Sequence, residues 1–236
     1  MSIAENIAAI RGRMCAAARA AGRSSEEILL CGASKMNDAQ ACREAIAAGI
    51  DCLGENRVQE MTQKLSEHAY DGAPLHFIGV LQKNKVRQVV GKVALIHSVD
   101  SMGLLDEIDK RAGMEQLVQD ILLEVNVGGE ESKSGFLPEA VRPAIEEVLR
   151  RKDCHVRIRG LMAIPPIAEE KGENLPYFTQ MHDLFVDSTP LLIHNENDKL
   201  ILSMGMSGDF EDAIAAGSTM IRVGTAIFGA RHYPLA

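Results

Sequence analysis

Residues 28–48, which read ILLCGASKMNDAQACREAIAA, decide the fold. The run Ile28 to Ala33 is short and apolar, which is typical of a buried strand. A helix is predicted from Asp38 to Ala48. Ser34 and Lys35 then lie where the strand ends, so the segment predicts one strand, a polar turn and one helix.

The same alternation recurs along the chain. The predicted strands are Ile28–Ala33, Cys52–Leu53, Leu75–Ile78, Leu95–His97, Asp120–Val125, Arg157–Met162, Leu200–Leu202 and Met220–Val223. Eight strands alternating with helices predict a parallel (β/α)8 barrel, a fold of about 250 residues. An open doubly wound sheet is the alternative, but it usually has fewer strands and a glycine-rich first turn, and the sequence has no GxGxxG, GKS or GKT motif. The chain of 236 residues shows no linker and is predicted to form a single domain over residues 1–236.

The composition of the chain restricts which partners and which cellular compartment are expected. The net charge of -8, with basic residues scattered among acidic ones, argues against a nucleic-acid partner. No apolar stretch approaches the roughly 18 to 20 residues of a membrane span, and Glu5 and Arg11 interrupt any signal-peptide core. The five cysteines are odd in number and form no CxxC pair, which favours reduced thiols. A cytoplasmic protein without a membrane contact is therefore expected.

The histidines show no metal-ligand spacing. Two of the seven, His76 and His97, alternate with apolar neighbours in predicted strands and are expected to be structural. Cys31 and Cys52 fall in apolar runs and are expected in the core. No metal site is predicted.

Long stretches of the sequence resemble a known family. They are, in order, ASKMNDAQACREAIAAGIDCLGENRVQE, LHFIGVLQKNKVRQVVGKVALIHSVDS, ILLEVNVGGEESKSGF, IRGLMAIPP and LSMGMSGDFEDAIAAGSTMIRVGTAIFGAR. Together they cover well over half of the chain and closely resemble the pyridoxal phosphate homeostasis protein family. The fold of that family is like the barrel domain of alanine racemase, so the resemblance independently implies a (β/α)8 barrel of the alanine racemase N-terminal type.

Lys35 is the first residue to which the resemblance gives a role. By pattern alone, a lysine after an apolar run is usually a solvated strand end. A primary amine held at the rim of a barrel is also well placed to condense with an aldehyde. The resemblance implies that Lys35 carries pyridoxal 5'-phosphate as a Schiff base.

A phosphate cradle is expected near the last two strands, because barrels often bind phosphate with the loops after strands 7 and 8. The resemblance implies that Ser207, Gly224 and Thr225 contact the phosphate. Gly224 has no side chain to hold a phosphate away, and Thr225 adds a hydroxyl beside a backbone amide. From pattern alone Ser207 also fits a helix N-cap. Ser203 is a further candidate, although it also fits a simple strand end.

Two polar residues are candidates for contacts to the cofactor ring. Arg222 lies between Ile221 and Val223, and an unpaired guanidinium is costly to bury, so it should face the barrel mouth and find an acceptor. The resemblance implies that the acceptor is the pyridine nitrogen. Asn56 follows the second predicted strand and fits either a ring contact or a cap for the helix 58–65, and the resemblance favours the ring.

Other lysines are weaker candidates for a reactive amine. Lys133 lies in the long loop 127–136, where it fits either a solvated charge or a secondary amine that receives or passes on the aldehyde. Lys83 and Lys85 fit a surface helix start better than a reactive role.

Three functions suit these features. The resemblance implies a binding protein that holds pyridoxal phosphate, limits free aldehyde and supplies apoenzymes, as a monomer or weak dimer without catalytic turnover. An amino-acid racemase is the first alternative, but it needs a second acid or base, and the chain has only Tyr70, Tyr177 and Tyr233 and ends about where the barrel closes. A Schiff-base aldolase acting on a sugar phosphate is the second, although Arg222 suits a pyridine nitrogen better.

Overall fold

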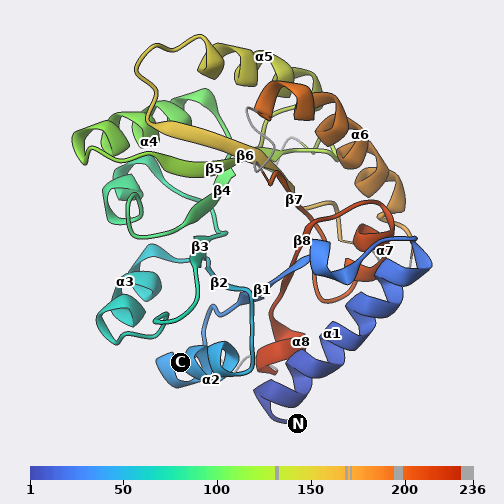
Figure 1. Ribbon diagram of the computed structural model, residues 1–236. Helices are drawn as coiled ribbons and strands as arrows, with labels where there is room; N and C mark the ends of the chain where they lie inside the picture. Colours follow the sequence, from blue (N-terminus) through green and yellow to red (C-terminus); the bar gives the residue numbers. More distant parts are fainter. Residues whose placement is uncertain (131–132, 168–169, 171, 194–198, 230–236) are drawn as a thin grey trace.

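The computed structural model describes the chain except for residues 131–132, 168–169, 171, 194–198 and 230–236. Its centre is a closed barrel of parallel strands that are paired in sequence order, with the last strand returning to pair with the first. The strands are β1 (Leu29–Ala33), β2 (Cys52–Glu55), β3 (Leu75–Phe77), β4 (Leu95–Val99), β5 (Gln119–Val125), β6 (Val156–Ala163), β7 (Ile201–Ser203) and β8 (Met220–Val223). The predicted (β/α)8 barrel is confirmed, and Figure 1 shows the helices outside the ring of strands.

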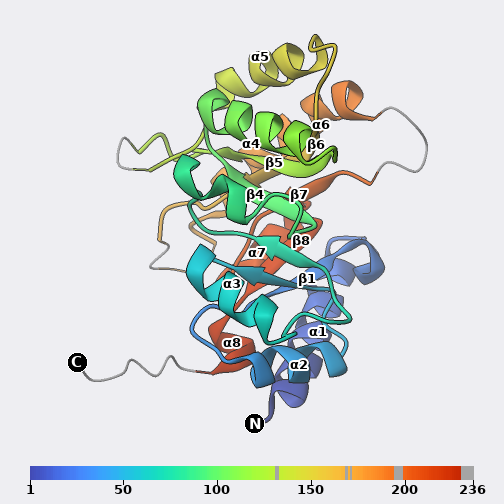
Figure 2. The same cartoon turned by 90° about the vertical axis from the view of Figure 1, so that its left-hand side faces the viewer.

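Helices connect successive strands and cover the outside of the barrel (Figures 1 and 2). They are α1 (Ile3–Ala20), α2 (Ala39–Ala47), α3 (Val58–Ser66), α4 (Met102–Met114), α5 (Pro138–Leu149), α6 (Leu175–Leu192), α7 (Phe210–Ala215) and α8 (Thr225–Phe228), with 3₁₀ turns η1 (Ser25–Glu27) and η2 (Lys83–Gln88). Among the described residues, none of these helices combines the length and apolar character that a membrane span requires.

Helix α1 precedes the barrel and lies against α2, α7 and α8. Its buried residues, Ile7, Ile10, Met14 and Ala18, recur every three or four positions and so form one stripe. Burying each of the larger side chains stabilises the fold by about 1.5–3 kcal/mol. The helix ends at Ala20, and Gly22 follows in the left-handed region with φ of 68°.

The predicted strands all exist, and the differences lie at their ends. The largest are in β2 and β4, which each run two residues further than predicted. Strand β2 continues past its apolar pair to Glu55 because Gly54 and Glu55 pair with His76 and Phe77 of β3. Polar and glycine residues at a strand end carry no apolar signal, so pairing rather than hydrophobicity extends this strand.

The connection between β3 and β4 contains a 3₁₀ turn, η2, in place of a regular α-helix. It begins at Lys83, so the sequence correctly placed a helical start there. Lys83 is exposed and Lys85 is half-buried, and both lie on this turn.

The barrel wall separates an outer apolar core, under the helices, from the side chains inside the barrel. Outward-facing strand residues such as Leu30 and Leu53 pack against the helices in one large apolar cluster. Inside the barrel, Cys31, Cys52, Ile78 and Met220 form a second cluster, and Leu95, Leu122 and Met162 form a third. Alternate residues of each strand therefore face opposite sides, as strand geometry requires.

Candidate functional site

The candidate residues gather on four adjacent strands, β7, β8, β1 and β2. Lys35 follows the end of β1 by two residues and is half-buried. Asn56 directly follows β2. Ala33 and Gly54 are register partners, so Lys35 and Asn56 stand two residues further along the two neighbouring chains. Their side chains therefore belong to the C-terminal rim, where barrels build their sites.

A buried ion pair fixes the backbone in front of Lys35. Lys64 Nζ of α3 donates to the Ser34 carbonyl oxygen at 2.8 Å, to Glu55 Oε1 at 2.6 Å and to Glu60 Oε1 at 2.8 Å. Lys64 is 4% exposed and Glu55 is 0% exposed. Burial opposes the charged form of Lys64, but the two carboxylates outweigh it and raise the pKa of Lys64. The peptide that precedes Lys35 is thus held by a charged, desolvated donor.

Two further hydroxyls complete this network. Ser34 Oγ donates to Glu55 Oε1 at 2.7 Å, and Tyr70 Oη donates to the same oxygen at 3.0 Å. Burial, followed by the Glu55 charge, raises the pKa of Tyr70 well above its usual value. Tyr70 therefore remains a neutral hydrogen-bond donor, and the three donors Lys64, Ser34 and Tyr70 converge on one carboxylate oxygen.

The turn after Lys35 is conformationally constrained. Met36 has φ of 63°, a left-handed backbone that costs a residue with a side chain roughly 1–2 kcal/mol. Its backbone N–H donates to Glu60 Oε1, the same oxygen that contacts Lys64. Asn37 Nδ2 donates to the Lys35 carbonyl oxygen at 3.0 Å. Lys35 thus sits in a tight turn that α3 supports from outside the barrel.

Asn56 has an open side-chain acceptor in the described part of the structure. Its Oδ1 atom is buried without a hydrogen-bond partner among the described residues. Helix α3 has Arg57 as its N-cap, without a side-chain cap, so the alternative of Asn56 as the helix cap does not hold. Gly79 allows the close packing of this loop, because a Cβ there would lie 2.2 Å from the Asn56 carbonyl oxygen. A buried, unpaired acceptor of this kind calls for a ligand donor or water.

Arg222 of β8 is 5% exposed and lies deeper than the rim. One terminal nitrogen donates to Ser203 Oγ at 2.6 Å, and the other donates to the Ala163 carbonyl oxygen at 3.0 Å. Burial lowers the pKa of Arg222, against the opposing effect of nearby acidic groups. A guanidinium nevertheless stays protonated in proteins, so Arg222 is a fixed cation held by two uncharged acceptors.

The predicted phosphate residues lie in two loops. Gly224 packs against the end of β1, since a Cβ there would lie 3.4 Å from the Ala33 carbonyl oxygen. Thr225 is exposed and opens α8, with Gly224 as its N-cap. Ser207 is half-buried in the turn after β7. The N-cap of α7 is Asp209, so the alternative interpretation of Ser207 as that cap was wrong.

Ser203 occupies a different place from the other phosphate candidates. It is fully buried at the end of β7, where its Oγ atom joins Arg222 to His97 Nδ1, 3.1 Å away. This position suits a support for the guanidinium better than a phosphate contact.

Lys133 lies in the loop that follows β5. Its Nζ atom is 2.8 Å from Glu130 Oε1, and both side chains are partly exposed. It borders a cavity of about 790 Å³ that also includes Ile164, Met206 and Asp209. The structure therefore places Lys35, Asn56, Arg222 and Gly224 on or just after the adjacent strands β1, β2 and β8, and leaves Lys133, Lys83 and Lys85 on other loops.

Sequence reasoning assigned no role to Lys64 and Glu55. Glu60 and Lys64 are four residues apart on a helix, which is the ordinary pattern of an exposed pair. Glu55 could have revealed this network. A charged carboxylate at the end of a buried strand is costly to bury without a partner, and the same reasoning drew attention to Arg222.

Comparison with known proteins places these residues in a family. Residues 3–232 match the family model for the alanine racemase N-terminal domain. A pyridoxal phosphate homeostasis protein of Aquifex aeolicus is 42% identical over 235 residues, covering 99% of this chain and 100% of its own. Its counterpart in Escherichia coli K12 is 40% identical over 237 residues, covering 98% and 97% of the two chains.

Solved structures give the same relationship. PipY of Synechococcus elongatus PCC7942, solved with PLP bound, is 33% identical with a TM-score of 0.80, and the match covers 97% of this chain and 100% of PipY. Alanine racemase of Clostridium difficile 630 has a TM-score of 0.68 at 17% identity, covering 89% of this chain and 53% of the racemase, which shows a shared fold. The barrel is therefore of the alanine racemase N-terminal type.

Proposed function

The chain belongs to the pyridoxal phosphate homeostasis protein family, and from this premise we propose that it holds pyridoxal 5'-phosphate as a Schiff base on Lys35 and releases it to other proteins. The observation that carries the proposal is the convergence of three groups on the adjacent strands β8, β1 and β2. They are one amine, one buried cation and one buried acceptor that has no partner among the described residues.

The residues present fit the cofactor. Asn56 Oδ1 lacks a hydrogen-bond partner among the described residues, so a polar ring substituent would satisfy it. Gly224 has no side chain to cover its backbone beside the end of β1. Thr225 offers a hydroxyl next to the backbone amides of that turn. Ser207 would approach from the neighbouring loop. We propose that Ser207, Gly224 and Thr225 together hold the phosphate.

Pyridoxal phosphate supplies a reactive aldehyde and an electron-withdrawing ring. Arg222 would donate a hydrogen bond to the ring nitrogen and cannot readily give up its proton. A ring that stays unprotonated withdraws electrons less strongly than one paired with a carboxylate. The role of Arg222 is therefore to orient the cofactor without activating it for amino-acid chemistry.

For the racemase alternative, the tyrosines are the candidates for the second acid or base. Tyr70 donates its phenol to Glu55, and burial keeps it neutral. Tyr177 lies on α6, and Tyr233 falls outside the described residues. These positions support a binding role without turnover.

We further propose that the protein works in the cytoplasm and supplies pyridoxal phosphate to apoenzymes, as a monomer or weak dimer. All five cysteines are free thiols, which suits a reducing compartment. The half-buried position of Lys35 leaves a route for exchange at the barrel mouth.

Replacing Thr225 with glutamate should weaken pyridoxal phosphate binding by about tenfold or more, because charge-assisted bonds to the phosphate contribute roughly 1.5–3 kcal/mol each. Pyridoxal lacks the phosphate and should lose far less affinity. Titration of both ligands by absorbance measures the difference. Thr179→Glu, at an exposed threonine on α6, is the matched control. Equal losses for the two ligands would count against the phosphate assignment.

The protein loaded with cofactor should not turn over amino acids at enzymatic rates. A racemase needs a second positioned acid or base, which contributes about 10² to 10⁴-fold, and the candidate Tyr70 is buried with its hydroxyl bonded to Glu55. The measurement is α-proton exchange and D-isomer formation from L-alanine and other L-amino acids in deuterium oxide. Turnover near about one per second that disappears in Lys35→Ala would restore the racemase.

A further inference from the structure

Three neighbouring strands bring two thiols and an imidazole together inside the barrel. Cys31 of β1, Cys52 of β2 and His76 of β3 each offer a ligand atom, and these atoms lie within 4.8 Å of one another. Cys31 and Cys52 are register partners. Gly54 opens space for the group, because a Cβ there would lie 2.9 Å from Cys31 Sγ.

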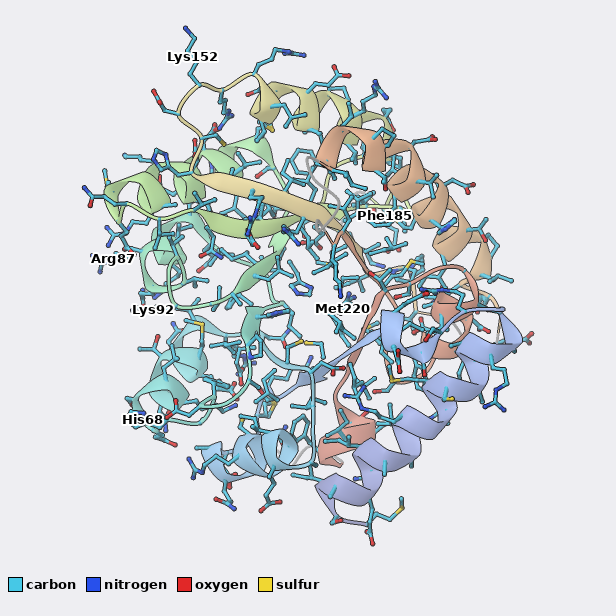
Figure 3. All side chains as sticks on the ribbon, in the orientation of Figure 1. His68, Arg87, Lys92, Lys152, Phe185 and Met220 are labelled. Carbon is cyan, nitrogen blue, oxygen red and sulfur yellow. The ribbon has the colours of Figure 1, made fainter. Side chains whose placement is uncertain are left out.

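The surroundings of this cluster are dry and rich in sulfur. Cys31 is 0% exposed, Cys52 2% and His76 6%. Met220 packs in the same interior cluster as both cysteines, and Figure 3 shows it within the ring of strands. Thiolate and thioether sulfur with one imidazole is the donor set that soft metal ions prefer.

Binding at the two thiols also involves a charge on a neighbouring strand. Cysteine binds a metal ion as the thiolate, so a bound ion must displace the thiol protons of Cys31 and Cys52. Arg222 is the register partner of Cys31 on β8, and its positive charge would balance negative charge on the sulfurs.

A hydrogen-bonded series of polar side chains supports the imidazole of His76. His76 Nδ1 lies 3.0 Å from His97 Nε2, and His97 Nδ1 lies 3.1 Å from Ser203 Oγ. A histidine that binds metal usually donates its other ring N–H, which fixes its tautomer. Here His76 would donate from Nδ1 to His97, and His97 would donate to Ser203, which leaves His76 Nε2 for the ion.

We propose that Cys31, Cys52 and His76 form a binding site for one thiophilic d¹⁰ metal ion, for which Cu⁺ is the better match and Zn²⁺ the alternative. Cu⁺ suits three soft ligands without a fourth, whereas structural Zn²⁺ sites almost always have four. Binding of Cu⁺ releases both thiol protons to solvent and leaves one net negative charge opposite Arg222. The ligands are separate from Lys35, so this site does not depend on the proposed cofactor chemistry.

The test is metal retention. The full chain is unfolded and refolded without oxygen in the presence of reductant and either Cu⁺ or Zn²⁺, passed over a chelating resin, and analysed for metal content. We expect about one Cu⁺ per chain, weaker retention of Zn²⁺, and loss of Cu⁺ in Cys52→Ala. Lys35→Ala should retain the ion like the parent chain, which separates this result from failure of the cofactor proposal.

Cys42→Ala is the matched control, because Cys42 is also a buried free thiol but lies on α2 outside the cluster. Circular dichroism after refolding ensures that only folded variants are compared, and Cys52→Val, which keeps the core filled, replaces Cys52→Ala if the latter does not fold. Retention of Cu⁺ that is unchanged by the Cys52 substitutions, or absence of both ions from the parent, would overturn the site. Retention of Zn²⁺ with no Cu⁺ would overturn the three-ligand copper assignment.

Discussion

The Lys35→Ala protein should show no visible absorbance band after incubation with pyridoxal phosphate, whereas the parent chain should show one. The reason is that the band requires conjugation between the cofactor ring and a lysine nitrogen, and Lys35 is the amine that stands beside Asn56 and the Gly224 turn. The phosphate contacts would remain, so we expect weaker, noncovalent binding of the cofactor in this variant.

Borohydride reduction followed by peptide mass mapping locates the covalent bond. In the parent chain the pyridoxyl adduct should fall on Lys35, and Lys35→Ala should yield no adduct at a single defined position. Lys133→Ala and Lys83→Ala are the controls, because both lysines lie on other loops and their removal should leave the band intact. An adduct confined to Lys133 or Lys83, or a parent protein without the band at saturating cofactor, would contradict the assignment.

Much of the barrel could be predicted because its strands are buried on both faces. Such strands read as short continuous apolar runs, and Met220–Val223 was predicted to the residue for this reason. The end of β2 could not be predicted, because Gly54 and Glu55 belong to the strand through their pairing with β3. For the connection between β3 and β4, the sequence predicted only that a helical segment begins near Lys83, and it did not predict a 3₁₀ turn.

The candidate site was predictable where a residue follows a strand by one or two positions. Lys35 and Asn56 were placed on one rim by that rule, and the register of β1 and β2 brings them together. Their chemical roles stay predictions. Ser203 shows the limit of the rule, because a strand-end hydroxyl can face the interior, and here it contacts Arg222.

Two groups of buried polar side chains could not be predicted from residue spacing in the sequence. Glu60 and Lys64 have the spacing of a surface pair, and only the packing of α3 against β2 buries the lysine. Cys31, Cys52 and His76 lie on separate strands, and the closure of the barrel alone brings them within reach of one ion. Such clusters depend on strand register, which local sequence patterns do not encode.

The Lys64→Met substitution is expected to lower the free energy of unfolding by about 3–5 kcal/mol, because it removes one partner of a buried ion pair and leaves the other charge uncompensated. Glu55 is 0% exposed, and its Oε2 atom already lacks a hydrogen-bond partner among the described residues. Loss of Lys64 would also release the Ser34 carbonyl and with it the turn that carries Lys35. Urea unfolding of the cofactor-free protein, followed by circular dichroism, measures the change.

Lys92→Met is the control for loss of a lysine, since Lys92 is exposed on the outer surface, where substitutions usually change stability by less than about 0.5 kcal/mol. A double variant, Lys64→Met with Glu55→Gln, tests the cause. Glutamine keeps an oxygen for Ser34 and Tyr70 but carries no charge, so the double variant should be more stable than Lys64→Met alone. If Glu55→Gln instead adds a further loss on top of Lys64→Met, the cost lies in packing of the lysine stem and the uncompensated-charge argument fails.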